Sequence, residues 1–275
     1  MNLNSFIGAL GFGKSQPLLI VSFGLIFVRL MMVVTFTPYL GGRLVPSNIK
    51  VLFSLALAIF TLPLIYPTLE ASELPAENIL ILFLFLKEAF FGLLLAVVNL
   101  MVFYALESVG SMIDNQRYVA NARIFNPSLG AQTSIFGVYI YQLAIAIFIS
   151  IGGHRYFLKA VIESFLTVPL LTFPHIAPGI TPMIDLFLKL SADTLVICLQ
   201  LSAPVLIAIF IADLVLGITN RIAPMINVFE MGFNIKGFVG VLLVYLSLPV
   251  VIFQMKYWFQ WMAFSFGRVA QFFAS

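Results

Sequence analysis

The chain has 275 residues, of which 62% are hydrophobic and 9% charged, and its mean hydropathy is +1.11. Soluble domains are roughly half apolar and about a quarter charged, so a soluble globule with a polar surface is excluded. The net charge is +3, but the basic residues are scattered, which gives no support for nucleic-acid binding. The composition therefore predicts an integral membrane protein.

Seven long apolar runs follow one another, and an aromatic tail comes after them. The runs lie at about 18–40, 49–66, 79–106, 135–151, 156–173, 183–216 and 238–255, and the tail at 256–275. About 20 apolar residues cross a bilayer as a helix, and irregular backbone cannot satisfy its polar groups in lipid. The runs predict an all-α, integral-membrane fold of helical hairpins, with kinks at Pro204 and Pro249.

Strict alternation of these seven runs across a membrane predicts no orientation. One side would hold Lys14, Arg155, Lys159, Arg221 and Lys236, and the other would hold Arg43, Lys50, Arg117, Arg123, Lys256 and Arg268. Basic residues normally gather on the cytoplasmic side. Either the runs are not all separate crossings, or the chain inserts unconventionally.

Ionisable side chains interrupt several runs, and membrane helices rarely expose such groups to lipid. Arg29 lies in the first run, and Glu88, Gly92, Ala96 and Asn99 share one helical face in the third. Small residues on that face permit close helix contact, so we expect it to meet protein. Arg29 is interpreted as a packing charge, whereas packing and functional roles both remain open for Glu88.

A polar segment at 110–134 separates two apolar runs and is longer than most connections. Its part 110–127 mixes apolar and polar side chains, so it suits neither lipid nor a solvated loop. Its predicted pore or plug residues are Met112, Ile113, Asp114, Asn115, Gln116, Arg117, Arg123 and Phe125. This composition favours a pore-lining or pore-plugging role, with a surface loop as the alternative.

A second polar segment, 213–237, interrupts the last two long runs. Gly217, Asn220 and Pro224 break the helical pattern there, which predicts the turn of a helical hairpin. Two charges of each sign accompany the turn, namely Asp213, Arg221, Glu230 and Lys236. Pairing among them could fix the hairpin, and the alternative is an ordinary polar turn.

Sequence patterns of catalysis or metal binding do not occur. His154 and His175 are the only histidines, and the chain has no HExxH, no GxSxG and no glycine-rich phosphate loop. Cys198 is the single cysteine, so an intrachain disulfide is impossible. We therefore predict neither an enzyme nor a cofactor. A membrane enzyme whose catalytic groups come together only in the folded chain is kept as an alternative.

The two polar segments resemble the SctT/FliR family, the T or R component of the export gate in bacterial type III secretion systems and flagella. IDNQR at 113–117 and FNPSLGAQTS at 125–134 look like the injectisome branch, and LGITNRIAPMINVF at 216–229 looks like the signature of both branches. Tyr118, Met225 and Asn234 stand where the family usually has Gly, Gln and Pro. The resemblance covers nearly the whole chain.

This resemblance implies an architecture and a set of partners. Residues 1–185, with the plug at 110–127, would resemble an R/P-type gate subunit, and 186–275 would resemble an S/Q-type hairpin with an amphipathic C-terminal helix. One copy would join several R/P-type and S/Q-type subunits in the inner membrane, surrounded by lipid. A large cytoplasmic-domain export subunit and a switch subunit would be further partners.

The function that the resemblance implies is passage of unfolded secreted proteins through a conduit that this chain lines and plugs. Partner machinery would supply the energy, so this chain would carry out no chemistry. A self-contained secondary transporter, with Glu88 or Asp213 as its midplane site, is the alternative.

Overall fold

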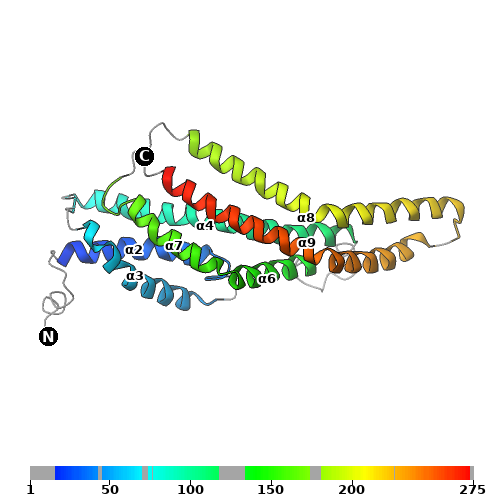
Figure 1. Cartoon of the computed structure of the whole chain (residues 1–275), viewed down its shortest axis with the longest axis horizontal. Coiled ribbons are helices and arrows are strands. Elements are labelled where there is room, and N and C mark those ends of the chain that lie inside the picture. The colour runs from blue at the N-terminus through cyan, green and yellow to red at the C-terminus, as the bar shows by residue number, and fades with distance from the viewer. Residues whose placement is uncertain are drawn as a thin grey trace. The chain divides into compact units, whose positions relative to one another are not determined.

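The computed structural model describes residues 16–42, 45–69, 74–75, 77–117, 134–173, 181–225 and 227–272. Within these ranges every regular element is an α-helix (Figure 1). The helices are α2 (Gln16–Phe36), α3 (Ser47–Leu69), α4 (Asn78–Gln116), α6 (Ile135–Ser150), α7 (Gly153–Thr167), α8 (Thr181–Ile222) and α9 (Val228–Phe272). The predicted all-α membrane fold is confirmed.

Helices α2, α3, α4, α8 and α9 are each long and apolar enough to cross a membrane. Helices α6 and α7 reach that length only as a pair, because a bend of 74° separates them. Gly152 lies in the break with φ of 76°, a left-handed conformation that glycine adopts without strain. The two middle runs are therefore the halves of one bent pair, which would make a sixth crossing.

The end of α4 differs from the sequence prediction. The helix continues to Gln116 and so includes the first part of the segment predicted as a connection. Leu106, Val109 and Ile113 are buried at helical spacing, so the inward apolar face persists beyond the end of the apolar run. Residues 118–133 lie outside the described residues.

The aromatic tail also differs, because it is the C-terminal part of α9 and no separate helix. Its predicted two-faced character is present where side chains are described. Trp258 and Met262 are buried, while Lys256 and Gln260 are exposed.

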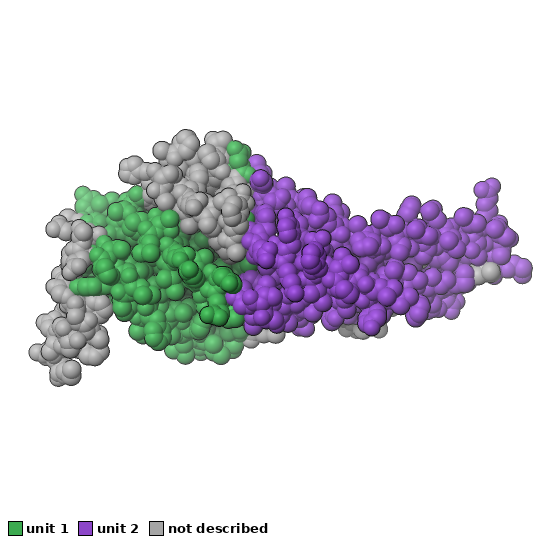
Figure 2. Space-filling view, viewed as in Figure 1, with its two compact units in different colours: residues 1–100, 154–186, 262–275 green, residues 101–153, 187–261 purple. Residues whose placement is uncertain are grey.

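Unit 1 comprises residues 1–100, 154–186 and 262–275 and has its own colour in Figure 2. Leu25, Ile26 and Leu30 form the buried side of α2. Helix α4 approaches α2 closely at Gly92, where an added Cβ would lie 2.5 Å from the carbonyl oxygen of Arg29. This glycine is therefore needed for the α2–α4 contact.

Unit 2 comprises residues 101–153 and 187–261. The rings of Phe103, Phe148 and Phe259 join α4, α6 and α9, with centroid separations of 5.0 to 5.5 Å. Helices α4 and α6 approach closely at Gly110, where a Cβ would lie 2.2 Å from the carbonyl carbon of Phe136. The aromatic cluster and this close approach define the core of unit 2.

Helices α8 and α9 form an antiparallel hairpin within unit 2 (Figure 1). Helix α8 ends at Ile222 and α9 begins at Val228, and a Cβ on Gly232 of α9 would contact Leu216 of α8. The predicted hairpin is thus confirmed, but its turn is shorter than predicted, because α8 continues through Gly217 and Asn220 to Ile222. Only 33% of the apolar stretch of α8 and 22% of that of α9 are buried, so lipid or protein must cover the remainder.

We predict that Gly92→Ala lowers the thermal unfolding midpoint of the detergent-solubilised protein. The new Cβ would collide with the α2 backbone, and overpacking of this kind costs about 1–3 kcal/mol. Gly217→Ala is the matched control, because a Cβ there meets nothing within 4 Å and should leave the midpoint unchanged or slightly raised. A Gly92→Ala protein as stable as this control would contradict the close approach.

Candidate functional site

A buried ion pair joins α2 to α4 in unit 1. Arg29 and Glu88 are both 0% exposed. The guanidinium of Arg29 donates from Nε to Oε2 of Glu88 and from Nη2 to Oε1, the latter over 3.0 Å. This bidentate geometry is the strongest form of an arginine–carboxylate contact. It places a paired charge inside the contact between α2 and α4.

The remaining donors of Arg29 reach the end of α7. Nη1 donates to Oγ of Ser164 over 3.1 Å, and Nη2 donates to the carbonyl oxygen of Val168 over 3.0 Å. The guanidinium carbon lies 4.8 Å from the ring centroid of Phe91 and 4.1 Å from that of Phe165. Arg29 therefore connects α2, α4 and α7 through hydrogen bonds and cation–π contacts.

Lys87 is the second cation at this carboxylate, with Nζ 2.8 Å from Oε1 of Glu88. The same Nζ donates to the carbonyl oxygens of Pro169 (2.7 Å), Leu170 (2.9 Å) and Thr172 (3.1 Å). Residues 168–173 follow α7 and are not helical, so their carbonyl groups lack the usual intrahelical donors. Lys87 supplies those donors, as irregular backbone near apolar surroundings requires.

A second polar cluster lies in unit 2, at the end of α4. Asp114 is only 3% exposed and accepts hydrogen bonds from Oγ of Ser134 (2.6 Å) and from the backbone N–H of Phe136 (2.9 Å). Ser134 is also the N-cap of α6, accepting from the N–H of Gly137 over 2.8 Å. Asp114 thereby joins the end of α4 to the start of α6, on either side of segment 118–133 in the sequence.

Arg117 extends this cluster to α9. Its Nη1 donates to Oδ1 of Asp114 over 3.3 Å, and its Nη2 donates to the carbonyl oxygen of Gly237 over 3.2 Å. The guanidinium carbon lies 4.5 Å from the ring centroid of Phe136. Partial burial lowers the pKa of Arg117, and the Asp114 carboxylate opposes that shift, so Arg117 remains a cation at neutral pH.

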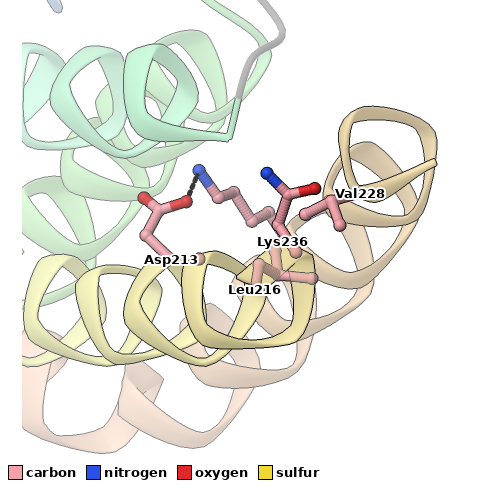
Figure 3. A pocket seen from close by; sticks show the side chains of 7 residues that line it. Asp213, Leu216, Val228 and Lys236 are labelled. Atoms are coloured by element: carbon pink, nitrogen blue, oxygen red, sulfur yellow. Dashed lines mark ion pairs between the residues drawn. The ribbon is translucent and has the colours of Figure 1, made fainter. Parts of the chain in front are cut away.

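An ion pair and a pocket lie between the helices of the α8–α9 hairpin. Lys236 is 1% exposed and its Nζ pairs with Oδ1 of Asp213, whose side chain is 39% exposed (Figure 3). The pocket holds about 270 Å³ and is lined by Asp213, Leu216, Gly217, Asn220, Val228, Gly232 and Lys236. One of the pairs predicted to fix the hairpin is therefore present.

The other charges near the hairpin turn are exposed. Glu230 lies in the first turn of α9, and its backbone N–H donates to Oδ1 of Asn227 over 3.3 Å. Arg221 lies in the last turn of α8, where a positive charge complements the helix dipole. Asn220 and Arg221 are both exposed, and Asn220 also lines the pocket.

The sequence that carries these polar sites matches a known protein family. The family described as Bacterial export proteins, family 1 matches residues 20–262. The chain belongs to this family.

Relatives in this family come from secretion systems and from flagella. The Yop proteins translocation protein T of Yersinia pestis is 34% identical over 218 residues, covering 79% of this chain and 77% of the relative. Flagellar biosynthetic protein FliR of Bacillus subtilis is 30% identical over 233 residues, covering 84% and 87%. Surface presentation of antigens protein SpaR of Shigella flexneri is 27% identical over 231 residues, covering 83% and 86%.

The predicted membership of the SctT/FliR family is confirmed by these matches. Together with the long apolar helices, they identify this export protein as a multi-pass component of a type III export apparatus in the bacterial inner membrane. Among the described residues, no group of three or more His, Cys, Asp or Glu side chains is placed to hold a metal ion.

The predicted protein-facing side of α4 is buried in this export protein. Glu88, Gly92, Ala96 and Asn99 all lie inside. The amide of Asn99 donates to the hydroxyl of Tyr39 over 3.0 Å. Burial raises the pKa of Tyr39 well above its usual range, and the Asn99 hydrogen bond opposes this only in part. The prediction that this face meets protein is confirmed, while a role of Glu88 and Asn99 in assembly stays a prediction.

The predicted plug residues fall into three groups. Ile113 and Asp114 are buried, and Met112 and Arg117 are half-buried. Asn115 and Gln116 are exposed on the last turn of α4. Arg123 and Phe125 lie outside the described residues. The buried members thus lie in the last turns of α4, and the pore role of the set stays a prediction.

Two contacts were not foreseen from the sequence. One is the pairing of Arg29 with Glu88, for which a signal existed, because two apolar runs carried opposite charges that burial would force together. The other is the contact of Lys87 with residues 169–172. No signal pointed to it, since those residues read as the end of an apolar helix.

We predict that Glu88→Gln destabilises the protein more than Lys87→Met. The first change leaves both Arg29 and Lys87 without their carboxylate, whereas the second preserves the bidentate Arg29–Glu88 contact. Removal of one partner of a buried pair costs about 3–5 kcal/mol, and thermal unfolding in detergent would measure the difference.

The control for this comparison is Glu163→Gln. Glu163 pairs with Lys159 over 3.6 Å on the exposed face of α7, and surface pairs contribute about 0–1 kcal/mol. Its thermal midpoint should match that of the unmodified protein. Equal midpoints for Glu88→Gln and Lys87→Met would show that Glu88 does not serve two cations.

Proposed function

We propose that this chain is an export-gate subunit that lines a conduit for unfolded secreted proteins, with 110–127 closing the conduit at rest. One observation carries the proposal. Asp114 holds Ser134 and the backbone of Phe136, so the helix ends that flank segment 118–133 in the sequence are held together at a buried base. A plug needs such a fixed base, because only then does displacement of the intervening residues open a path and remain reversible.

The chemistry of the proposed plug suits a gate that must open for a polypeptide. Asn115 and Gln116 are exposed and tolerate water, while Arg123 and Phe125 add one charge and one apolar ring to the sequence of the segment. Many weak contacts can be displaced one by one. A single very stable buried cluster would instead resist opening by its whole free energy.

The proposed partners are the smaller R/P-type and S/Q-type subunits, several copies of which would surround one copy of this chain. The exposed apolar surface of the hairpin supports this, since Ile207, Phe210 and Phe238 are each more than half exposed. Membrane lipid would cover the remaining surface. Arg221 and Glu230 near the turn would contact the large cytoplasmic-domain export subunit, and the switch subunit is a further proposed partner.

In this proposal the chain performs no chemistry. Its relatives are named for translocation, flagellar biosynthesis and antigen presentation at the surface, and none of these names denotes an enzyme. Energy would come from partner ATPase and proton-driven machinery. The role of this chain would be to line the path and to keep it closed until a substrate arrives.

A self-contained secondary transporter is the second candidate, and the Asp213 pocket is the observation in its favour. Glu88 is a poor transport site, because Arg29 and Lys87 already occupy its carboxylate in a fully buried position. The half-exposed Asp213 is the better one. Substrate or proton flux through the purified chain in liposomes, abolished by Asp213→Asn, would favour the transporter over the gate.

We predict that deletion of residues 119–122 leaves assembly intact but makes the inner membrane permeable to small solutes. The deletion shortens the proposed plug and retains its base at Asp114, Arg117 and Ser134. Co-purification with the smaller subunits would measure assembly, and uptake of a small charged dye would measure leakage.

Deletion of residues 70–73 is the control of equal length. It shortens the connection between α3 and α4, which the proposal gives no part in closure, so no leak is expected. A protein that lacks 119–122, assembles normally and stays as tight as this control would rule out the plug.

A further inference from the structure

Arg117 contacts α9 at two glycines one turn apart, through the backbone carbonyl of Gly237 and the missing side chain of Gly240. Gly237 accepts a hydrogen bond from Nη2 of Arg117, and Gly240 lies so close that an added Cβ would be 2.3 Å from Cδ and 2.6 Å from Nε of Arg117. We call Gly237 and Gly240 the glycine notch. Any side chain at position 240 would require the Arg117 side chain to shift.

The glycine notch is also connected to α8. Lys236 immediately precedes Gly237, and its buried Nζ pairs with Asp213 of α8. Arg117 in turn holds Asp114, which binds Ser134 and Phe136 at the start of α6. Polar contacts therefore join α8 to α9 at Lys236, α9 to α4 at the neighbouring Gly237, and α4 to α6 at Asp114, all within unit 2.

The bonds of Arg117 are suited to release. Its two hydrogen bonds, of 3.2 and 3.3 Å, are at the long end of the normal range. Its Nε is buried and has no hydrogen-bond partner among the described residues. An unsatisfied buried N–H group lowers the net cost of leaving the notch, because water can bind it once it is exposed. Arg117 thus packs closely against α9 but is held by weak hydrogen bonds.

We propose that Arg117 couples the α8–α9 hairpin to the base of segment 118–133. A helical partner that shifts the hairpin moves the glycine notch, withdraws Gly237 from Arg117 and loosens the grip of Asp114 on the start of α6. Arg117 acts as a positioning residue with two arrangements, seated and released. The coupling itself does not depend on the proposed function. Its consequence does, because a loosened base can free the plug only if 110–127 is a plug.

Two alanine substitutions on the same turn of α9 test this coupling. Gly240→Ala drives a Cβ into Arg117, whereas a Cβ on Gly237 meets nothing within 4 Å, so Gly237→Ala is a matched control. Both changes raise helix propensity equally, and neither alters segment 118–133. Hydrogen–deuterium exchange on the assembled complex would report on the backbone N–H of Arg117, bonded to Ile113, and on that of Phe136.

We expect exchange of these two amides to become about tenfold faster in Gly240→Ala and to stay unchanged in Gly237→Ala. Unchanged exchange in both variants, or an equal rise in both, would overturn the coupling. If Gly240→Ala does not assemble, Arg117→Lys replaces it. That change keeps a charge near Asp114 but loses the fork that also reaches Gly237, and Arg155→Lys on the exposed surface of α7 is its control.

Dye leakage, measured in parallel, separates this inference from the proposed function. Faster exchange with leakage supports both the coupling and the plug. Faster exchange without leakage supports the coupling and overturns the plug. Leakage without faster exchange overturns the coupling, since the base would then have stayed in place.

Discussion

Glu88 is the carboxylate that two buried cations share, and unit 1 is arranged around it. Arg29 takes both carboxylate oxygens, so Lys87 is only partly neutralised and directs its other protons at backbone carbonyl groups. The chain after α7 provides these carbonyl groups because it leaves the helix there. The irregular backbone after α7 needs hydrogen-bond donors, and the ammonium group of Lys87 needs acceptors. Each therefore satisfies the hydrogen bonds of the other.

Unit 2 applies the same principle at the ends of helices. Asp114 binds the N-cap residue of α6 and one of the free N–H groups of its first turn, while Arg117 neutralises the carboxylate. An export protein with so much exposed apolar surface gains little specificity from apolar contacts alone, because lipid offers equivalent ones. Its buried polar contacts therefore decide which helices meet, and both clusters lie where a helix ends.

Apolar runs were sufficient to predict the helices, the hairpin and the buried face of α4, because each depends on local composition or helical spacing. The end of α4 was missed since Asp114, Asn115 and Gln116 read as a loop. Asn115 and Gln116 are exposed and Asp114 bonds inside the protein, so none of them opposes a helix. The Arg29–Glu88 pair joins residues 59 positions apart, and only tertiary structure selects such a partner.

The bent α6–α7 pair explains why counting basic residues gave no orientation. Seven separate crossings would put the segment after α4 and the hairpin turn on opposite sides of the membrane. The hydrogen bond from Arg117 to Gly237 requires them to be on the same side. A single crossing by the bent pair satisfies this requirement, because α8 is then the fifth crossing and its turn faces the side of the α4 end.

That count also restores a charge bias. In the sequence, the segments on the side of the hairpin turn then contain Arg43, Lys50, Arg117, Arg123, Arg221 and Lys236, and those on the opposite side contain Lys14, Lys189, Lys256 and Arg268. The positive-inside rule assigns the richer side to the cytoplasm. The proposed plug base and the hairpin turn would then both face the compartment in which export substrates are made, where a partner that moves the hairpin could act on the base through Arg117.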